Sequence, residues 1–155
     1  MDDDWNVAAV EAYADDYPGA ASFHAALVEI EADRSLPRTI ILSRMEHNRV
    51  IAGAMIHPSF LTENCYDLSW VFVAKAYRGN GYGSAIIDEA IAKIESELLG
   101  GERGSIIISV LDRNVSLYEK FGFVLGARLH DGVTMVRIAN SGGPFPKSAS
   151  VYARA

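Results

Sequence analysis

A glycine-rich run in the middle of the chain constrains the fold more than any other feature of the sequence. An apolar segment ends at Val73, glycines follow as Gly79, Gly81 and Gly83, and an amphipathic segment begins at Ser84. This order predicts a strand, a tight turn and a helix. Glycines remove side chains where a ligand must approach the main chain, and the helix adds the positive end of its dipole. The run therefore predicts a site for an anion such as phosphate.

The length and composition are those of one globular domain. The chain has 155 residues, 50% hydrophobic and 22% charged, which is enough to bury a core and to form a cofactor cleft. No apolar run approaches the roughly 20 residues of a membrane span, and the acidic beginning does not resemble a secretory signal. Cys65 is the only cysteine, so we expect no disulfide and no metal site. These features favour a cytoplasmic protein that does not bind membranes.

The charge of the chain argues against nucleic acid as a partner. The formal net charge is −6, whereas phosphate neutralisation requires a basic face. The acidity is uneven, because residues 1–33 contain nine carboxylates and no lysine or arginine. Such a segment attracts a cationic substrate. A solvated helix face that aids solubility explains the same charges, so both interpretations stay open.

Hydrophobic periodicity predicts a mixed α/β domain over residues 1–139. Helical spacing occurs on both sides of a Tyr-Pro-Gly break at 17–19, and the run at 66–73 reads as a central strand. The helix expected at 84–98 leads to a buried strand at 105–110, and such a crossover makes the two strands parallel. The other expected elements are a hairpin of strands at 38–43 and 49–56, a short helix after Asn114 that contains Phe121, strands at 123–125 and 133–138, and a tail at 140–155.

A second group of residues follows the strand at 105–110. Asn114 precedes the short helix, Tyr118 lies within it, and Phe121-Gly122-Phe123 ends it. Together with Arg78-Gly79-Asn80-Gly81-Tyr82-Gly83, this pattern resembles the GNAT superfamily of acyl-CoA-dependent N-acyltransferases. The resemblance covers residues 38–138. It implies a single α/β (α+β) domain whose mixed central sheet has splayed parallel strands flanked by helices.

The resemblance implies acetyl-CoA as cosubstrate, with no metal. Main-chain N–H groups of the turn would hold the pyrophosphate, and the bulged end of the strand at 66–73 would bind the pantetheine arm and polarise the thioester carbonyl. Asn114 would contact the pantetheine, or would only cap the next helix. The implied cofactor-binding residues are Phe72, Val73, Arg78, Gly79, Asn80, Gly81, Tyr82, Gly83, Ser84 and Asn114.

The resemblance also suggests where the proton transfers occur. Tyr118 corresponds to a tyrosine near the thioester sulfur, where its phenol would assist the departing thiolate as general acid. Core packing is its alternative role. Asp67, on the strand at 66–73, is the first candidate for the base that deprotonates the amine through water, and Glu63 is the second. His57 is a weaker candidate base, and Cys65 is expected to pack.

The acceptor is the part that the sequence defines least. The family transfers its acyl group directly to an amine, and the acidic first segment favours a small cationic amine or an amine-bearing peptide. Most relatives begin with a strand, whereas helical spacing begins this chain, which leaves the acceptor side divergent. The resemblance also allows a homodimer, with Phe145, Val151 and Tyr152 as surface candidates.

Two other functions match parts of the same sequence pattern. A Rossmann dinucleotide site uses a similar glycine motif, but here the motif follows a hairpin, its sixth position is Ser84, and too little chain follows for a doubly wound sheet. A non-catalytic acyl-CoA sensor of the same fold is the alternative from another class. Acceptor-dependent release of free thiol distinguishes an enzyme from a sensor.

Overall fold

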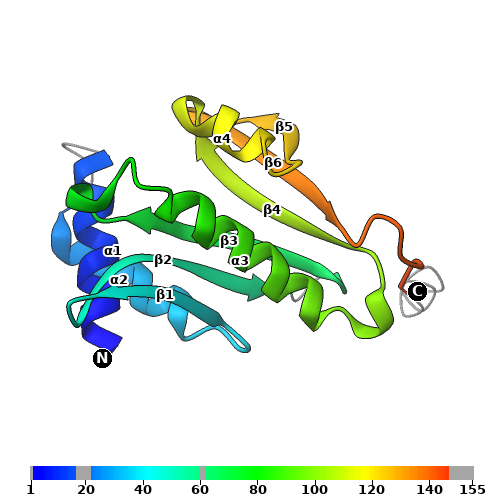
Figure 1. The fold of residues 1–155 in the computed structure, drawn as a ribbon, viewed down its shortest axis with the longest axis horizontal. Coiled ribbons are helices and arrows are strands. Elements are labelled where there is room, and N and C mark those ends of the chain that lie inside the picture. The colour runs from blue at the N-terminus through cyan, green and yellow to red at the C-terminus, as the bar shows by residue number, and fades with distance from the viewer. Residues whose placement is uncertain (1, 17–21, 60–61, 147–155) are drawn as a thin grey trace. The chain divides into compact units, whose positions relative to one another are not determined.

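The computed structural model describes residues 2–16, 22–59 and 62–146. Its contacts divide the chain into a first unit, Met1–Met55 with Trp70–Ile87, and a second unit, Ile56–Ser69 with Asp88–Ala155. Strands β2 (Arg49–Pro58) and β3 (Cys65–Val73) and helix α3 (Tyr82–Glu97) contribute residues to both units. The other labelled elements in Figure 1 are α1 (Asp2–Asp16), α2 (Phe23–Arg34), β1 (Ile40–Glu46), β4 (Gly104–Leu111), α4 (Val115–Glu119), β5 (Val124–Arg128) and β6 (Gly132–Ala139).

The strands form one mixed sheet, which confirms the α/β class predicted from the sequence. Their order is β1-β2-β3-β4-β6-β5. β3 and β4 are parallel, as the crossover through α3 predicts, and they pair over Cys65–Asp67 on β3. Both strands continue beyond this short ladder. β4 and β5 each pair antiparallel with β6.

The predicted hairpin between β1 and β2 is confirmed, and its turn uses an unusual pair of residues. His47 and Asn48 both lie in the left-handed region, with φ values of 49° and 60°. Positive φ at both central residues is the geometry of a type I′ turn, which suits the twist of a two-residue hairpin. Asparagine tolerates this region better than most residues, whereas histidine in the first position gave no turn signal of the Asn-Gly kind.

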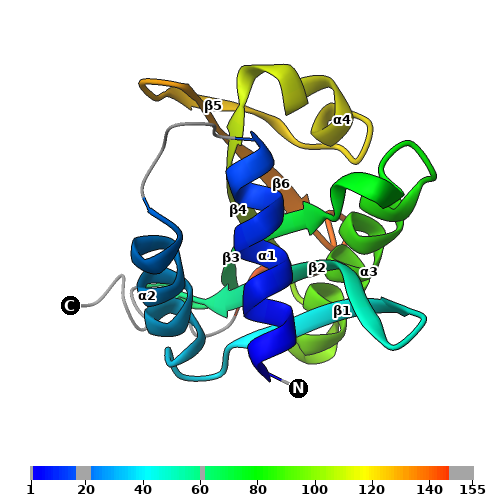
Figure 2. The same cartoon turned by 90° about the vertical axis from the view of Figure 1, so that its left-hand side faces the viewer.

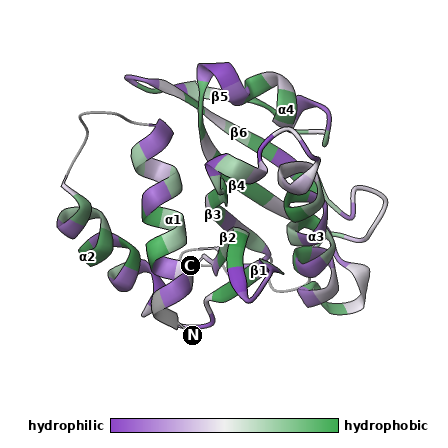
Figure 3. Ribbon diagram, turned by 60° about the vertical axis from the view of Figure 1, so that its left-hand side comes forward, coloured by the Kyte–Doolittle hydropathy of each residue, from purple (hydrophilic) through white to green (hydrophobic). Residues whose placement is uncertain are grey.

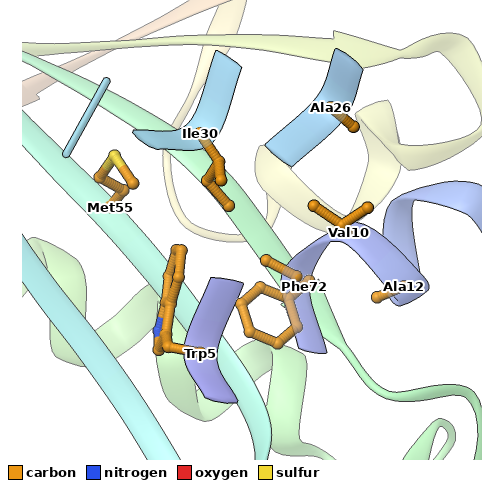
Figure 4. Close-up of a cluster of buried hydrophobic side chains, with 8 residues drawn as sticks. Trp5, Val10, Ala12, Ala26, Ile30, Met55 and Phe72 are labelled. Carbon is orange, nitrogen blue, oxygen red and sulfur yellow. The ribbon is translucent and has the colours of Figure 1, made fainter. Parts of the chain in front are cut away.

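Helices α1 and α2 lie beside each other in the first unit (Figure 2). Trp5 of α1 anchors their shared core, because its Nε1–H donates to the carbonyl of Leu42 at 2.9 Å and its ring meets Phe72 edge-on. A Cβ on Gly53 would lie 2.5 Å from the Trp5 indole nitrogen, so only glycine lets β2 approach the helix this closely. Figure 4 labels members of this core: Trp5, Val10, Ala12, Ala26, Ile30, Met55 and Phe72.

β3 is irregular near its end, at Trp70. The φ of Trp70 is 48°, in a region that a bulky residue rarely adopts. Its indole Nε1–H donates to Asp33 Oδ2 at 2.9 Å, and its ring lies 5.6 Å from that of Tyr13. The resemblance implied a bulge around Phe72 and Val73, whereas the left-handed residue of β3 is Trp70, whose indole contacts Tyr13 of α1 and Asp33 of α2.

Helix α3 confirms the amphipathic pattern. Figure 3 shows hydrophobic and hydrophilic residues along the same helix, as expected of a helix with one buried side. On the outer side of the helix, Lys93 pairs with Glu97 at 3.2 Å. The buried side of the segment expected at 84–98 consists of Ile86, Ile87, Ala90, Ile91, Ile94 and Leu98.

Helix α4 is shorter than the sequence predicts. It ends at Glu119, so Phe121 lies in the following turn and not in the helix. Gly122, with φ of 85°, ends this turn.

Residues after β6 contact the loop before β4. Arg103 N–H donates to Pro144 O at 2.7 Å, and the Arg103 guanidinium lies over the Phe145 ring. Val151 and Tyr152 lie outside the described residues. Among those described, no helix is long and apolar enough to cross a membrane.

Candidate active site

The glycine turn that leads into α3 has the geometry of an anion site. Gly79 and Gly81 have φ values of 79° and 86°, and apart from the adjoining residues no atom lies within 4 Å of where a Cβ on either would stand. The first helical hydrogen bond joins Ala85 N–H to the Gly81 carbonyl. The N–H groups just before Ala85 therefore have no acceptor within the helix. Space, N–H donors and the helix dipole coincide at this turn, which fits a phosphate.

The side chains of the turn brace it from within. Asn80 Nδ2 donates to the carbonyls of Tyr77 and Arg78 at 3.1 and 3.2 Å. Tyr82 donates its hydroxyl to Glu46 Oε1 at 3.1 Å and meets Tyr77 edge-on. The hydrogen bond to the Glu46 carboxylate is the main cause that raises the pKa of Tyr82 above its ordinary value, so this phenol stays protonated as a donor. The side chains of Asn80 and Tyr82 are thus engaged within the protein.

The end of β3 adjoins the turn within the first unit. Phe72 is buried against Trp5, so its side chain belongs to the core. Val73 lies against α3, with its Cγ2 3.6 Å from the position of a Cβ on Gly83. Ala74 N–H donates to Ile51 O at 2.7 Å and keeps the strand end on β2. The first unit therefore brings together all the predicted cofactor residues except Asn114.

Tyr118 and Asn114 lie in the second unit, on and next to α4. Tyr118 is 5% exposed, and its ring meets Phe123 edge-on with the centroids 5.7 Å apart. Its carbonyl accepts from the N–H groups of both Phe121 and Phe123, so the turn after α4 closes on this residue. Asn114 occupies the N-cap position, but its side chain makes no capping hydrogen bond. The cap-only interpretation of Asn114 is therefore the weaker one.

The candidate bases also lie in the second unit, and their surroundings differ. Asp67 is exposed on β3, opposite Ile107 in the parallel ladder, and Glu63 is exposed in the loop before the strand. Exposure suits a carboxylate that accepts a proton through water. His57 is 7% exposed at the end of β2. In the described ranges, no three His, Cys, Asp or Glu residues gather closely enough to hold a metal ion.

Sequence reasoning missed one side-chain arrangement at the site. The guanidinium of Arg78 contacts the C-terminal turn of α1 as well as the end of β3. The only sequence signal was the carboxylate Asp16 at the end of a helix, and nothing in the local pattern pairs it with a residue so far along the chain.

Comparisons with known proteins bear on the family and the fold. The model of the acetyltransferase (GNAT) family matches residues 6–123. The PaiA N-acetyltransferase of Thermoplasma acidophilum, solved with coenzyme A, is 17% identical with a TM-score of 0.67 over 87% of this chain and 92% of that one. An aminoglycoside 6'-N-acetyltransferase with coenzyme A is 15% identical, TM-score 0.68, over 90% and 92%. The Escherichia coli ribosomal-protein-S18-alanine N-acetyltransferase is 17% identical, TM-score 0.64, over 85% and 87%.

The likenesses to solved structures show the fold, and the family model shows the family. No curated protein sequence is significantly similar to this one. The family model nevertheless matches far more than half of the chain and includes the glycine turn and Tyr118. This protein therefore belongs to the acetyltransferase (GNAT) family and is an acetyl-CoA-dependent N-acetyltransferase.

Proposed function

We propose that the protein transfers the acetyl group of acetyl-CoA directly to a primary amine, either a small cationic amine or an amine-bearing peptide. The observation that carries this proposal is the open glycine turn before α3, where Gly79 and Gly81 leave space for a phosphate in front of N–H groups that have no acceptor within the helix. Family membership supplies the identity of the donor.

Each proposed role follows from the chemistry of one group. Acetyl-CoA supplies an activated thioester when it is bound. The Val73 N–H would donate to the thioester oxygen as negative charge develops there. Asp67 would accept a proton from the amine through water, and Tyr118 would give its proton to the sulfur as the carbon–sulfur bond breaks and the carbon–nitrogen bond forms. Tyr118 regains its proton from the nitrogen of the tetrahedral intermediate, and Asp67 passes the proton of the ammonium group to water. The products are the amide, the free thiol and one proton, so atoms and charge balance.

The charge of the first unit supports a cationic acceptor. Asp4, Glu11, Asp15, Glu29 and Glu31 are exposed on α1 and α2. Two other carboxylates on these helices, Asp16 and Asp33, are engaged with Arg78 and Trp70. The similar structures include an enzyme named for aminoglycosides and one named for the alanine of a ribosomal protein, which illustrates both acceptor classes.

The direct test is release of free thiol from acetyl-CoA in the presence of a panel of amines. We expect release that depends on the acceptor, with polyamine-like and amino-terminal peptide acceptors ahead of neutral or acidic amines. Mass spectrometry of the product identifies the acetylated nitrogen. Tight binding of acetyl-CoA with no acceptor-dependent release from any amine would favour the sensor function.

Asp67→Asn tests the base. We expect kcat/KM for the amine to fall about 100-fold, the usual size of a general-base contribution. The deficit should shrink at a pH above the pKa of the amine, because the amine is then already neutral. Glu63→Gln is the matched control, since it neutralises a nearby exposed carboxylate. A pH-independent loss in Asp67→Asn, or a larger loss in Glu63→Gln, would remove Asp67 from this role.

A further inference from the structure

We propose that Arg78 is a positioning residue whose guanidinium joins the C-terminal turn of α1 to the end of β3 and so fixes the glycine turn, without binding the phosphates of acetyl-CoA itself. The inference rests on the proposed role of the turn. In this role the Arg78 side chain contacts other residues of the protein, and only the Arg78 main chain is available to acetyl-CoA.

The contacts of Arg78 account for all three of its guanidinium nitrogens. Nε donates to the Val73 carbonyl at 3.0 Å. Nη1 donates to Asp16 Oδ1 at 3.1 Å, and Nη2 donates to the Ala12 carbonyl at 3.3 Å. One planar group thus holds two segments that are more than sixty residues apart in sequence, since Ala12 and Arg78 are separated by 66 positions.

The location of these acceptors suits an arginine and no other side chain. Ala12 and Asp16 lie at the C-terminal end of α1, where the helix dipole favours a cation. The rigid fork of N–H donors can meet a carboxylate and two carbonyls at once, which a lysine ammonium on its flexible stem does not reproduce. The Arg78–Asp16 ion pair is 36% and 38% exposed, so by itself it contributes little. The hydrogen bonds from Arg78 to the main-chain carbonyls of Val73 and Ala12 are therefore what connects β3 to α1.

The hydrogen bonds of the Arg78 side chain to Val73, Ala12 and Asp16, which we call the Arg78 clamp, close a short loop beside the proposed phosphate site. Val73 ends β3, a single 3-10 turn follows at Lys75–Tyr77, and Arg78 returns its side chain to the Val73 carbonyl. Gly79 follows Arg78 directly. The conformation of the first glycine of the turn is therefore tied to β3 and α1. A guanidinium that moved to a phosphate would give up this connection.

The sign of the Asp16 effect separates positioning from direct binding. A carboxylate near an anion site repels the anion, so if Arg78 bound phosphate, Asp16→Asn would free the arginine and strengthen acetyl-CoA binding. If Arg78 positions the turn, Asp16→Asn loosens the clamp and weakens binding. The direction in which Asp16→Asn changes the affinity for acetyl-CoA therefore shows which of the two roles Arg78 has.

The experiment is a double-mutant cycle on the Kd for acetyl-CoA, measured by calorimetry on the full chain. We expect Arg78→Met to weaken binding about tenfold and Asp16→Asn about threefold, in keeping with a partly exposed network. The double variant should bind no more weakly than Arg78→Met, because coupled residues are not additive. Lys75→Met, which removes an exposed positive charge near the turn, should change the Kd less than twofold.

Each other outcome overturns the proposal. Tighter binding by Asp16→Asn, or additive losses in the double variant, would make Arg78 a phosphate ligand. A Tm that falls in Arg78→Met while its Kd is unchanged would make the clamp purely structural. A loss in Lys75→Met equal to that in Arg78→Met would reduce the effect to net charge. Failure of the unmodified protein to bind acetyl-CoA would instead contradict the proposed function.

Discussion

Gly81→Val should abolish acetyl-CoA binding, with a Kd at least about 100-fold higher, while the protein stays folded. Gly81 has a φ of 86°, which a β-branched residue adopts only with strain, and the turn would change shape to relieve it. The new side chain would also stand in the open space in front of the turn amides. Calorimetric titration with acetyl-CoA measures the loss.

Folding should survive this change for a reason that the structure gives. Apart from the adjoining residues, no atom lies within 4 Å of a Cβ at Gly81, so the cost is backbone strain of about 1–3 kcal/mol and not a clash with the core. A domain of ordinary stability tolerates that. Gly142→Val is the matched control, because a Cβ there also meets nothing within 4 Å and its φ is not positive. Unchanged affinity in Gly81→Val with a normal circular dichroism spectrum would remove the turn from the acetyl-CoA site.

The parts of the fold that local sequence encodes were predictable. The glycine turn and α3 follow from spacing within one stretch, and the amphipathic segment that begins at Ser84 does bury one side, from Ile86 to Leu98. The parallel pairing of β3 with β4 follows from the crossover helix between them. Local rules worked here because the residues that decide these elements are close together in the chain.

The parts that depend on tertiary contacts were not predictable. The left-handed backbone at Trp70 is accompanied by contacts with Asp33 and Tyr13, neither of which is near it in sequence. The Arg78 clamp has the same character. Both features bring α1 or α2 to the end of β3, and helix contacts of this kind leave no periodic signal. The sequence predicts too long a helix at α4 for a related reason. Phe121 continues the apolar pattern of the helix, but it lies in the turn that closes on Tyr118.

Tyr118→Phe should lower kcat by about 100-fold or more and change the Kd for acetyl-CoA less than about twofold, because a general acid contributes at this scale to the chemical step alone. The substitution keeps a six-membered ring in the same buried position against Phe123. What it removes is the phenol proton that the proposed mechanism gives to the departing sulfur. The kcat deficit should persist across amine acceptors, since thiol departure is common to all of them.

Tyr66→Phe is the control for the removal of a buried hydroxyl group. Tyr66 is 8% exposed on β3 in the same unit, and it has no proposed role in the reaction. Each variant loses one phenol hydroxyl from a buried site, at a cost of about 1 kcal/mol in the free energy of unfolding if a hydrogen bond is lost. A similar loss of kcat in both variants would mean that the effect is one of packing. Equal losses of kcat and acetyl-CoA affinity in Tyr118→Phe would make this tyrosine a binding residue, because only a proton donor to the leaving thiolate separates the two quantities.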